Sequence, residues 1–242
     1  MKIILSSSTE PSFNLAAEQY LLSHNEPYLF LYVNVACVVI GYNQAVMNEV
    51  DLNFCIENDI SINRRLSGGG AVYHDLGNLN YCFIFNKTNA PLSADFLLPV
   101  VHGLQQLEIP VEIRKRKDLW LPGGHKISGT ASHVSKGREL HHGTLLYDTD
   151  LGKLLRALNP FSRNLVAKAS PSVPSPVKNI RSYLKEEGKN VFSFSGFVDR
   201  FIAEMKEFYQ IKTLISFTKD DLEAIETIRQ EKYSKSEWNY KM

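Results

Sequence analysis

The stretch Arg64-Arg65-Leu66-Ser67-Gly68-Gly69-Gly70-Ala71-Val72-Tyr73-His74-Asp75 decides the fold, because it places a glycine-rich turn directly before a strand. Three consecutive glycines let the backbone approach a ligand closely and turn N–H groups toward it. The arginine pair before them supplies charges that a phosphate accepts in a bidentate fashion. No Gly-Lys-Ser/Thr follows, so the stretch is not a P-loop, and it lacks the GxGxxG pattern of dinucleotide sites. The spacing fits two interpretations: a cradle for a nucleotide or phosphate, or a hairpin loop with a solvated arginine pair.

Hydrophobic patterns on both sides of this turn predict one α/β domain over residues 1–242, with a mixed sheet and helices packed outside it. Strands are predicted at residues 29–33, 36–40, 71–73, 81–85, 111–113, 119–121, 144–147 and 213–217. The first two are expected to pair with each other. Helices are predicted from Pro11 onward and at 97–107, 151–158, 197–208 and 222–228, the last with Thr218 as its N-cap. Residues 170–176 contain three prolines, which predicts an exposed loop.

Composition and charge exclude several classes of function. Hydrophobic residues make up 44% of the 242 residues, enough for a sizeable core. The net charge of +1 indicates no polyanionic partner, so we expect no nucleic-acid binding. The N-terminus has too few apolar residues for a signal peptide, and the longest apolar stretch, residues 29–42, is too short to span a bilayer. The three cysteines form no CxxC pair, so we expect a cytoplasmic protein without a membrane partner.

A lysine follows a second strong turn signal. Pro122-Gly123-Gly124 predicts a tight turn, which places Lys126 in the return strand of a hairpin. If Lys126 faces inward, its charge needs an anion beside it, either a protein carboxylate or a ligand phosphate. The alternative is a surface lysine whose stem lies along the protein and whose ammonium reaches water.

Four histidines cluster between His125 and His142, which suggests a metal site. Their spacing matches no HExxH or zinc-finger pattern. The adjacent His141 and His142 point to opposite faces of an extended strand, so a hydrogen-bonding role for one of them is favoured over a metal cluster. No Gly-x-Ser-x-Gly elbow is present, and Cys82 lies in an aromatic strand where it is expected to be core.

The ordered motifs resemble the lipoate–protein ligase A family over nearly the whole chain. The glycine-rich stretch, continued through Asn78, is the strongest of them. Lys115-Arg116-Lys117-Asp118-Leu119 stands where the family usually has an Arg-Asn-Asp-Leu type of run. The others are Phe13-Asn14-Leu15-Ala16-x-Glu18, Val38-Val39-Ile40-Gly41-Tyr42-Asn43-Gln44, Lys126-Ile127-Ser128-Gly129-Thr130-Ala131, His141-His142-Gly143-Thr144-Leu145-Leu146 and Glu237-Trp238-Asn239.

The resemblance implies the α/β catalytic domain of the biotin/lipoate ligase superfamily. It also implies an enzyme that activates lipoate with ATP and Mg²⁺ to lipoyl-AMP. The acyl group would then pass to a lysine of a lipoyl domain, in an E2 subunit or the glycine-cleavage H protein. The implied ATP and adenylate site comprises Arg65, Ser67, Gly69, Gly70, Ala71, Val72, Tyr73, Asn78 and Lys126. The implied lipoate site comprises Tyr32, Val39, Ala71, His74, Lys126 and His142. Lys126 would be the catalytic residue, bridging the lipoyl carbonyl and the α-phosphate, and Asp118 would bind Mg²⁺.

Two departures from the family pattern bear on these roles. Common bacterial members continue past the Trp-Asn with an accessory domain, and in some versions that domain is a separate polypeptide, so an accessory partner is one expectation here. The adenylate-covering loop usually reads Ser-Val-Arg-Ser-x-Val-x-Asn, whereas this chain has Pro174 and Pro176 at positions that are often basic. Lys168 or Lys178 is expected to compensate for the lost charge.

Other activities of the same superfamily differ from the ligase in the residues that they need. An octanoyltransferase needs a cysteine thiolate, but no cysteine follows Cys82, and Glu139 stands where one branch carries its cysteine. A lipoyltransferase that uses ready-made lipoyl-AMP fits the same motifs as a full ligase. A biotin ligase would show a Gly-Arg-Gly-Arg segment, which is absent. A non-catalytic lipoyl-binding subunit would have no need for Lys126 or the intact glycine-rich stretch.

Overall fold

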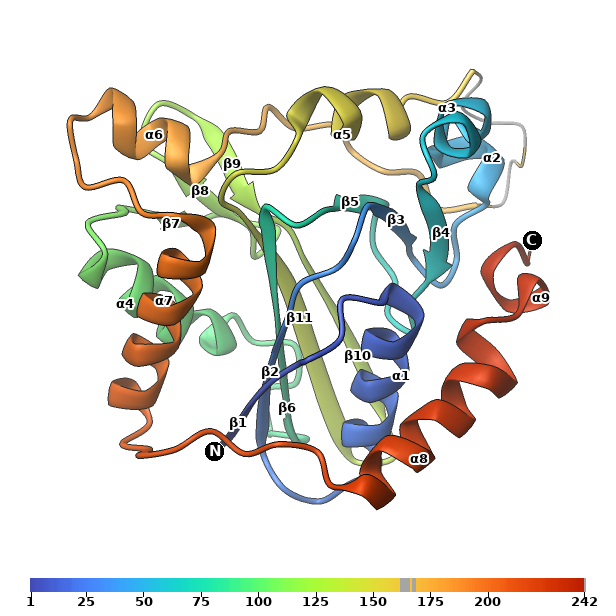
Figure 1. Cartoon of the computed structure of the whole chain (residues 1–242), viewed down its shortest axis with the longest axis horizontal. Helices are drawn as coiled ribbons and strands as arrows, with labels where there is room; N and C mark the ends of the chain where they lie inside the picture. The colour runs from blue at the N-terminus through green and yellow to red at the C-terminus, as the bar shows by residue number, and fades with distance from the viewer. Residues whose placement is uncertain (162–165, 167–168, 242) are drawn as a thin grey trace.

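A five-stranded mixed sheet separates two layers of helices in the computed structural model (Figure 1). Helices α1 and α8 cover one face of this sheet, and α4 and α7 cover the other. The structure describes residues 1–161, 166 and 169–241. Among the helices in these ranges, none is long and apolar enough to cross a membrane.

The large sheet has one parallel pair, between its first two strands, and is otherwise antiparallel. In spatial order its strands are β1 (Lys2–Leu5), β2 (Tyr28–Tyr32), β6 (Asn78–Asn86), β11 (Arg138–Leu146) and β10 (Thr130–Ser135). The long central pair β6 and β11 sets the register, with Cys82 opposite His142.

Two smaller sheets close one end of the large sheet and carry most of the site. The first consists of β4 (Ser61–Arg64), β3 (Cys37–Ile40) and β5 (Val72–His74). The second consists of β7 (Glu112–Ile113), β8 (Leu119–Leu121) and β9 (His125–Ser128). The glycine-rich turn lies between β4 and β5, and Lys126 lies in β9, so both of the sequence motifs meet at this end.

The helices begin and end at residues that favour those boundaries. Pro11 opens α1 at a position where its missing N–H costs nothing. Thr218 and Asp221 form a capping box at the start of α8, as expected for the N-cap. The helices are α1 (Pro11–Leu22), α2 (Val46–Glu49), α3 (Leu52–Glu57), α4 (Leu98–Gln106), α5 (Leu151–Ala157), α6 (Ile180–Glu186), α7 (Phe194–Phe208), α8 (Lys219–Ile228) and α9 (Ser236–Asn239), with a 3₁₀ turn at Asp95–Leu97 and a π-helical turn at Arg229–Tyr233.

Strand β2 is buried on both faces, which fits its position between two helix layers. Because side chains alternate along a strand, Leu29 and Leu31 join the core under α4 and α7. Phe30 and Tyr32 join the core under α1 and α8. Each such side chain contributes about 1.5–3 kcal/mol through burial. The apolar run therefore marks a central strand.

The structure corrects the predictions for four of the expected strands. Residues 29–33 and 36–40 form strands, but the prediction that they pair with each other is wrong: β2 pairs with β1 and β6, and β3 pairs with β4 and β5. The predicted strand at 213–217 is reduced to a single bridge between Ile215 and Ile4. The strand expected at 144–147 is the end of the longer β11, whose first half was hidden by buried charged residues and histidines.

Glu139 of β11 ties a surface loop to the large sheet. Its carboxylate is 1% exposed and accepts hydrogen bonds from Thr88 N at 2.7 Å, Leu92 N at 3.3 Å and His141 Nε2 at 2.9 Å. The His141 ring stacks on Phe96, with 4.4 Å between centroids. Burial raises the pKa of Glu139, but the hydrogen bonds from Thr88, His141 and Leu92 outweigh it, and the net pKa lies below the ordinary value.

We predict that Glu139→Ala lowers the free energy of unfolding by roughly 2–4 kcal/mol, because it leaves buried donors without an acceptor. Urea unfolding followed by circular dichroism measures the change. Glu57→Ala, which removes the same side chain from an exposed position at the end of α3, is the matched control and should stay within about 0.5 kcal/mol of the parent. Equal midpoints for the two variants would contradict the role of Glu139.

Candidate active site

Two cavities meet beside the glycine-rich turn. The first has a volume of about 290 Å³ and the second of about 390 Å³. The first extends inward between β2, β3 and β11 and is lined by Leu15, Tyr32, Val39, Arg65, His74 and His142, among others. The second lies toward α5 and is lined by Tyr73, Leu146, Leu154, Leu155 and Val177, among others. Both have the size and partly apolar lining typical of small-molecule sites.

Lys126 lies where the two cavities join, because it lines both of them. Lys126 lies in β9, and residues 176–178 hold its backbone from the other side. Lys126 N donates to Pro176 O at 2.8 Å, and Lys178 N donates to Lys126 O at 3.2 Å. Its Nζ lies 3.5 Å from Asp118 Oδ2, with 23% of the lysine side chain exposed. Of the two alternatives for Lys126, the structure agrees with the inward lysine beside a protein carboxylate and not with the surface lysine.

Asp118 has an unused hydrogen-bonding position in the first cavity. Its side chain is 6% exposed, and Oδ1 has no hydrogen-bond partner among the described residues. A buried carboxylate oxygen without a partner is costly, and it indicates a cation or donor that a ligand brings. Arg116 lines the same cavity and adds a second positive side chain at its mouth.

The glycine-rich turn is packed too closely for side chains at two points. A Cβ at Gly41 would lie 2.2 Å from Gly69 O, so the turn lies directly on the end of β3. A Cβ at Gly70 would lie 2.9 Å from Ser172 Oγ. The next amide, Ala71 N, donates to this hydroxyl at 2.8 Å. The turn thus directs a backbone N–H toward the boundary shared by both cavities, where Ser172 provides an oxygen acceptor.

The two arginines make their hydrogen bonds inside the protein. Arg65 is 4% exposed and donates to Val39 O at 3.0 Å, Gly68 O at 2.6 Å, Gly70 O at 2.8 Å and Ser67 Oγ at 3.0 Å. Burial lowers the pKa of Arg65 to about 10, which still leaves it charged at neutral pH. The interpretation of a solvated arginine pair is therefore wrong, because Arg65 shapes the turn from within.

Arg64 points the other way and holds residues near the C-terminus. Its guanidinium donates to Gly41 O at 2.9 Å and Gln44 O at 2.7 Å, and also to Trp238 O at 3.0 Å and Lys241 O at 2.8 Å. It therefore connects the turn after β3 to the segment around α9.

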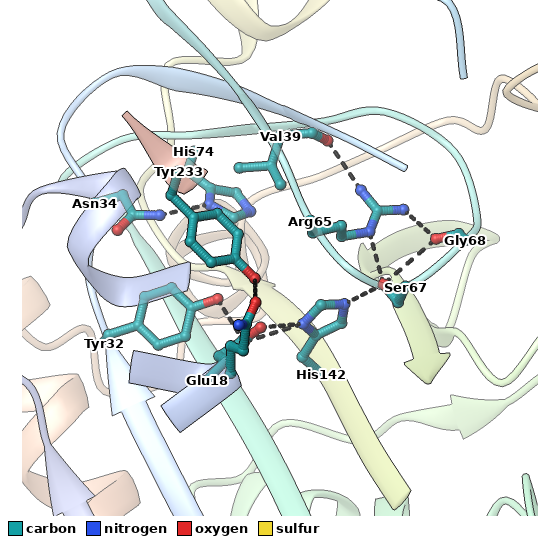
Figure 2. A network of polar contacts seen from close by, with 11 residues as sticks. Glu18, Tyr32, Asn34, Val39, Arg65, Ser67, Gly68, His74, His142 and Tyr233 are labelled. Atoms are coloured by element: carbon teal, nitrogen blue, oxygen red, sulfur yellow. Dashed lines mark hydrogen bonds and ion pairs between the residues drawn. The ribbon is translucent and has the colours of Figure 1, made fainter. Parts of the chain in front are cut away.

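A buried polar network links Arg65 to Glu18 of α1 (Figure 2). Ser67 Oγ accepts from Arg65 Nε and lies 2.7 Å from His142 Nε2. His142 Nδ1 donates to Glu18 Oε2 at 2.9 Å, and Tyr32 donates its hydroxyl to Glu18 Oε1 at 2.9 Å. One buried positive and one buried negative group are thus joined through the side chains of Ser67 and His142, which offsets the cost of burying each.

Glu18 was assigned no role from the sequence, although a signal for it exists. It lies three residues after Leu15 and three before Leu21, on the apolar face of α1, and it is 3% exposed. A lone carboxylate on a buried helix face needs a partner from another element, and the structure shows that this partner is His142.

The structure brings most of the expected site residues to the two cavities. Arg65, Gly69, Gly70, Ala71, Val72, Tyr32, Val39, His74, His142, Asp118 and Lys126 line the first cavity, and Ala71, Val72, Tyr73 and Lys126 line the second. Ser67 and Asn78 are fully buried and line neither cavity. Asn78 Nδ2 instead donates to Asn80 Oδ1 at 2.9 Å. These two residues support the walls from behind.

The proline-rich segment passes over both cavities. Residues 171–173 line the first cavity, and 172–175 line the second. Of the two lysines expected to compensate for the missing arginine, Lys178 forms an ion pair with Glu186, and Lys168 lies outside the described residues.

All three cysteines are buried and free. Burial raises the pKa of Cys55 to about 11, and it raises the pKa of Cys37 and Cys82 further. Thiols with raised pKa values stay protonated at neutral pH and are poor nucleophiles. The expectation that Cys82 belongs to the core is confirmed.

Comparisons with known proteins agree with this geometry. A family model described as the lipoyl protein ligase A/B catalytic domain matches residues 10–206. Lipoate-protein ligase LplJ of Bacillus subtilis is 36% identical over 236 residues, which is 96% of this chain and 70% of that protein.

Solved structures show the same fold. A bi-partite lipoate protein ligase of Thermoplasma acidophilum, described with its E2 lipoyl domain, superposes with a TM-score of 0.83 at 28% identity, over 99% of this chain and 95% of that one. A lipoate-protein ligase A bound with ATP superposes with a TM-score of 0.80 at 26% identity, over 99% of this chain and 98% of that one. The expected architecture, the α/β catalytic fold of lipoate ligases, is confirmed. The chain belongs to the lipoyl protein ligase A/B catalytic domain family.

Proposed function

We propose that this chain activates lipoate with ATP, forming lipoyl-AMP and pyrophosphate, and then transfers the lipoyl group to a lysine of a lipoyl domain. The observation that carries the proposal is the position of Lys126 at the junction of two cavities. A reaction that joins two small molecules needs both of them held in contact, with a positive charge where they meet. The relatives named lipoate-protein ligases, and the one bound with ATP, support this choice of substrates.

The two substrates divide between the cavities according to the linings. The lipoyl chain would extend into the first cavity, where Leu15, Tyr32 and Val39 supply apolar walls. The adenosine would lie in the second cavity, against Leu146, Leu154 and Val177. The lipoate carboxylate and the α-phosphate would then meet at Lys126.

In the first step a carboxylate oxygen of lipoate attacks the α-phosphorus of ATP. The new oxygen–phosphorus bond forms as the bond from the α-phosphorus to the bridging oxygen breaks, and pyrophosphate leaves with its electron pair. Negative charge grows on the α-phosphate oxygens, where Lys126 Nζ and the Ala71 N–H would stabilise it. Ser172 Oγ, which accepts from Ala71 N in the structure, occupies the direction from which a phosphate oxygen would accept.

In the second step the neutral ε-amine of the acceptor lysine attacks the acyl carbon of lipoyl-AMP. A carbon–nitrogen bond forms, the bond from the acyl carbon to the phosphate oxygen breaks, and AMP leaves. The nitrogen releases its extra proton to solvent. Lys126 beside the acyl oxygen would stabilise the charge that develops there. The proposed acceptors are the lipoyl domain of a 2-oxoacid dehydrogenase E2 subunit and the glycine-cleavage H protein, and we include a separate accessory polypeptide as a proposed partner for activation.

A divalent cation fits the residues at the mouth of the first cavity. Mg²⁺ is commonly held by one or two carboxylates together with substrate phosphates. Asp118 offers the partnerless Oδ1 and would be its protein ligand. When bound there, Mg²⁺ would neutralise charge on the ATP phosphates.

The burial of every thiol argues against the rival octanoyltransferase. Such an enzyme needs an exposed cysteine thiolate in a basic setting, whereas all three cysteines here are buried with raised pKa values. A lipoyltransferase that uses ready-made lipoyl-AMP would share every feature of the site. Only a measurement of pyrophosphate release distinguishes it from a full ligase.

We predict that the purified chain releases pyrophosphate from ATP and Mg²⁺ only when lipoate is added, and that Lys126→Ala lowers this rate at least 10²–10³-fold, a typical loss for one charge-stabilising group. A coupled pyrophosphate assay measures the rate. Lys185→Ala, which removes an exposed lysine of α6, is the matched control and should react like the parent.

Lys126→Ala should stay folded by circular dichroism, so that the loss reports on chemistry. Lipoate-independent release, or normal release by the variant, would contradict the mechanism. No release from the folded parent would contradict activation by this chain alone. Mass spectrometry of an apo lipoyl domain with synthetic lipoyl-AMP would then show whether the chain is a transferase only.

We predict that Asp118→Asn raises the Mg²⁺ concentration needed for half-maximal pyrophosphate release at least tenfold, because the amide keeps the size of the side chain but loses the charge that a hard cation prefers. A Mg²⁺ titration at saturating ATP and lipoate gives this concentration. If the Mg²⁺ concentration for half-maximal release stays unchanged while the rate falls, Asp118 does not bind Mg²⁺ and acts only by positioning Lys126.

We predict that a variant with all three cysteines changed to alanine keeps its acyl-transfer rate within about twofold, since protonated buried thiols do not take part in the chemistry. The rate is measured on folded protein with the lipoyl domain as acceptor. Loss of transfer in one single Cys→Ala variant that still folds would revive a thiol mechanism.

A further inference from the structure

His74 has an unused ring nitrogen in the first cavity. The residue is the last one of β5, is 4% exposed and lines the cavity together with Tyr32 and Val39. Its Nδ1 lies 3.0 Å from Asn34 Nδ2, as Figure 2 shows. Its Nε2 is buried and has no hydrogen-bond partner in the described part of the chain. The lipoate mechanism at Lys126 makes no use of this nitrogen.

The hydrogen bonds behind His74 determine which nitrogen carries the proton. Asn14 Nδ2 lies 3.0 Å from the carbonyl oxygen of Ser8, which can only accept, so the amide orientation of Asn14 is settled. Asn14 Nδ2 also donates to Asn34 Oδ1 at 2.8 Å. The other end of the Asn34 amide, its NH₂, therefore faces His74 and donates to Nδ1. A neutral histidine that accepts at Nδ1 carries its hydrogen on Nε2.

The His74 ring is neutral under ordinary conditions. Burial, followed by the charge of Arg65, lowers its pKa to about 3. The cavity wall therefore presents a neutral N–H donor among apolar groups. Leaving such a donor unpaired in a complex is costly, so a ligand that brings an acceptor to this point binds better than one that brings only CH₂ and CH₃ groups.

We propose that His74 determines specificity for the far end of the acyl chain, its Nε2–H donating to a sulfur of the dithiolane ring and thereby favouring lipoate over octanoate. This inference rests on the proposed function. Lys126 and the glycine-rich turn would hold the carboxylate end at the cavity junction, and Leu15, Tyr32 and Val39 bound the inner part that receives the chain. Disulfide sulfur is a weak hydrogen-bond acceptor, whereas the methyl group at the end of octanoate accepts no hydrogen bond.

The test is calorimetric binding of lipoate and of octanoate to the full chain and to His74→Leu, which replaces the ring by an apolar side chain of similar size and so removes the donor. We expect the parent to prefer lipoate and His74→Leu to lose about tenfold of that preference, the range of one neutral hydrogen bond. His74→Gln, which restores an N–H donor, should regain part of it. His102→Leu in α4, which does not line the cavity, is the matched control and should bind both acids like the parent.

An NMR measurement on the parent protein tests the same hydrogen bond without relying on a variant that could misfold. The ¹⁵N-attached Nε2 proton of His74 should shift on addition of lipoate and should shift much less with octanoate. A preference unchanged in folded His74→Leu, or equal proton shifts with the two acids, would overturn the assignment while lipoate binding still supports the proposed function. Failure of the folded parent to bind lipoate at all would overturn the proposed function and this inference with it.

Discussion

The hydrogen bonds of the Arg65 guanidinium hold the glycine-rich turn in the shape on which the site depends. Three of its acceptors are backbone carbonyls, from the end of β3 and from the turn itself. The planar guanidinium can satisfy several carbonyls at once in a fixed geometry, which a lysine ammonium does less well. The buried charge is balanced across Ser67 and His142 by Glu18 of α1. A helix, the large sheet and a small sheet thus converge on one cation, and the backbone N–H groups beside it gain a defined direction.

Arg65 and Lys126, two of the positive side chains that line the first cavity, consequently have different characters. Arg65 is enclosed and fully engaged, so it acts on ligands through the backbone that it shapes. Lys126 has a flexible stem, one carboxylate neighbour and partial exposure, so its ammonium is free to follow a charge that moves during a reaction. Asp118 keeps that ammonium near the junction of the cavities without enclosing it. The glycine-rich turn around Arg65 is therefore the more rigid side of the site, and the Lys126 side chain of the β8–β9 hairpin is the more mobile side.

The sequence predicted those parts of the molecule that depend on local chemistry. The turn at Pro122-Gly123-Gly124 and the capped start of α8 follow from nearby residues, and the structure agrees. For Lys126 the nearby residues left an inward and a surface position open, and the structure shows the inward one. The incorrect pairing of residues 29–33 with 36–40 has a non-local cause: the buried Asn34 between them bonds to Asn14 and His74, and the chain leaves one sheet there for another. The strand expected at 213–217 has apolar residues of the right kind but meets only one bridge partner.

Within the site, motif resemblance pointed to residues that mostly line the two cavities, but it did not reveal which partners each of them contacts. The alternation of side chains along a strand accounts for the opposite orientations of Arg64 and Arg65. No spacing indicates which partners each of them contacts, or that Glu18 balances the charge of Arg65 through Ser67 and His142. This opposition has a mechanical consequence. Arg64 donates to the carbonyls of Trp238 and Lys241, while Arg65 donates to carbonyls of the glycine-rich turn. The end of β4 therefore connects these two segments. Residues 238–241 and the glycine-rich turn are therefore held by two side chains that only one peptide bond separates, so the position of the one segment is tied to the position of the other.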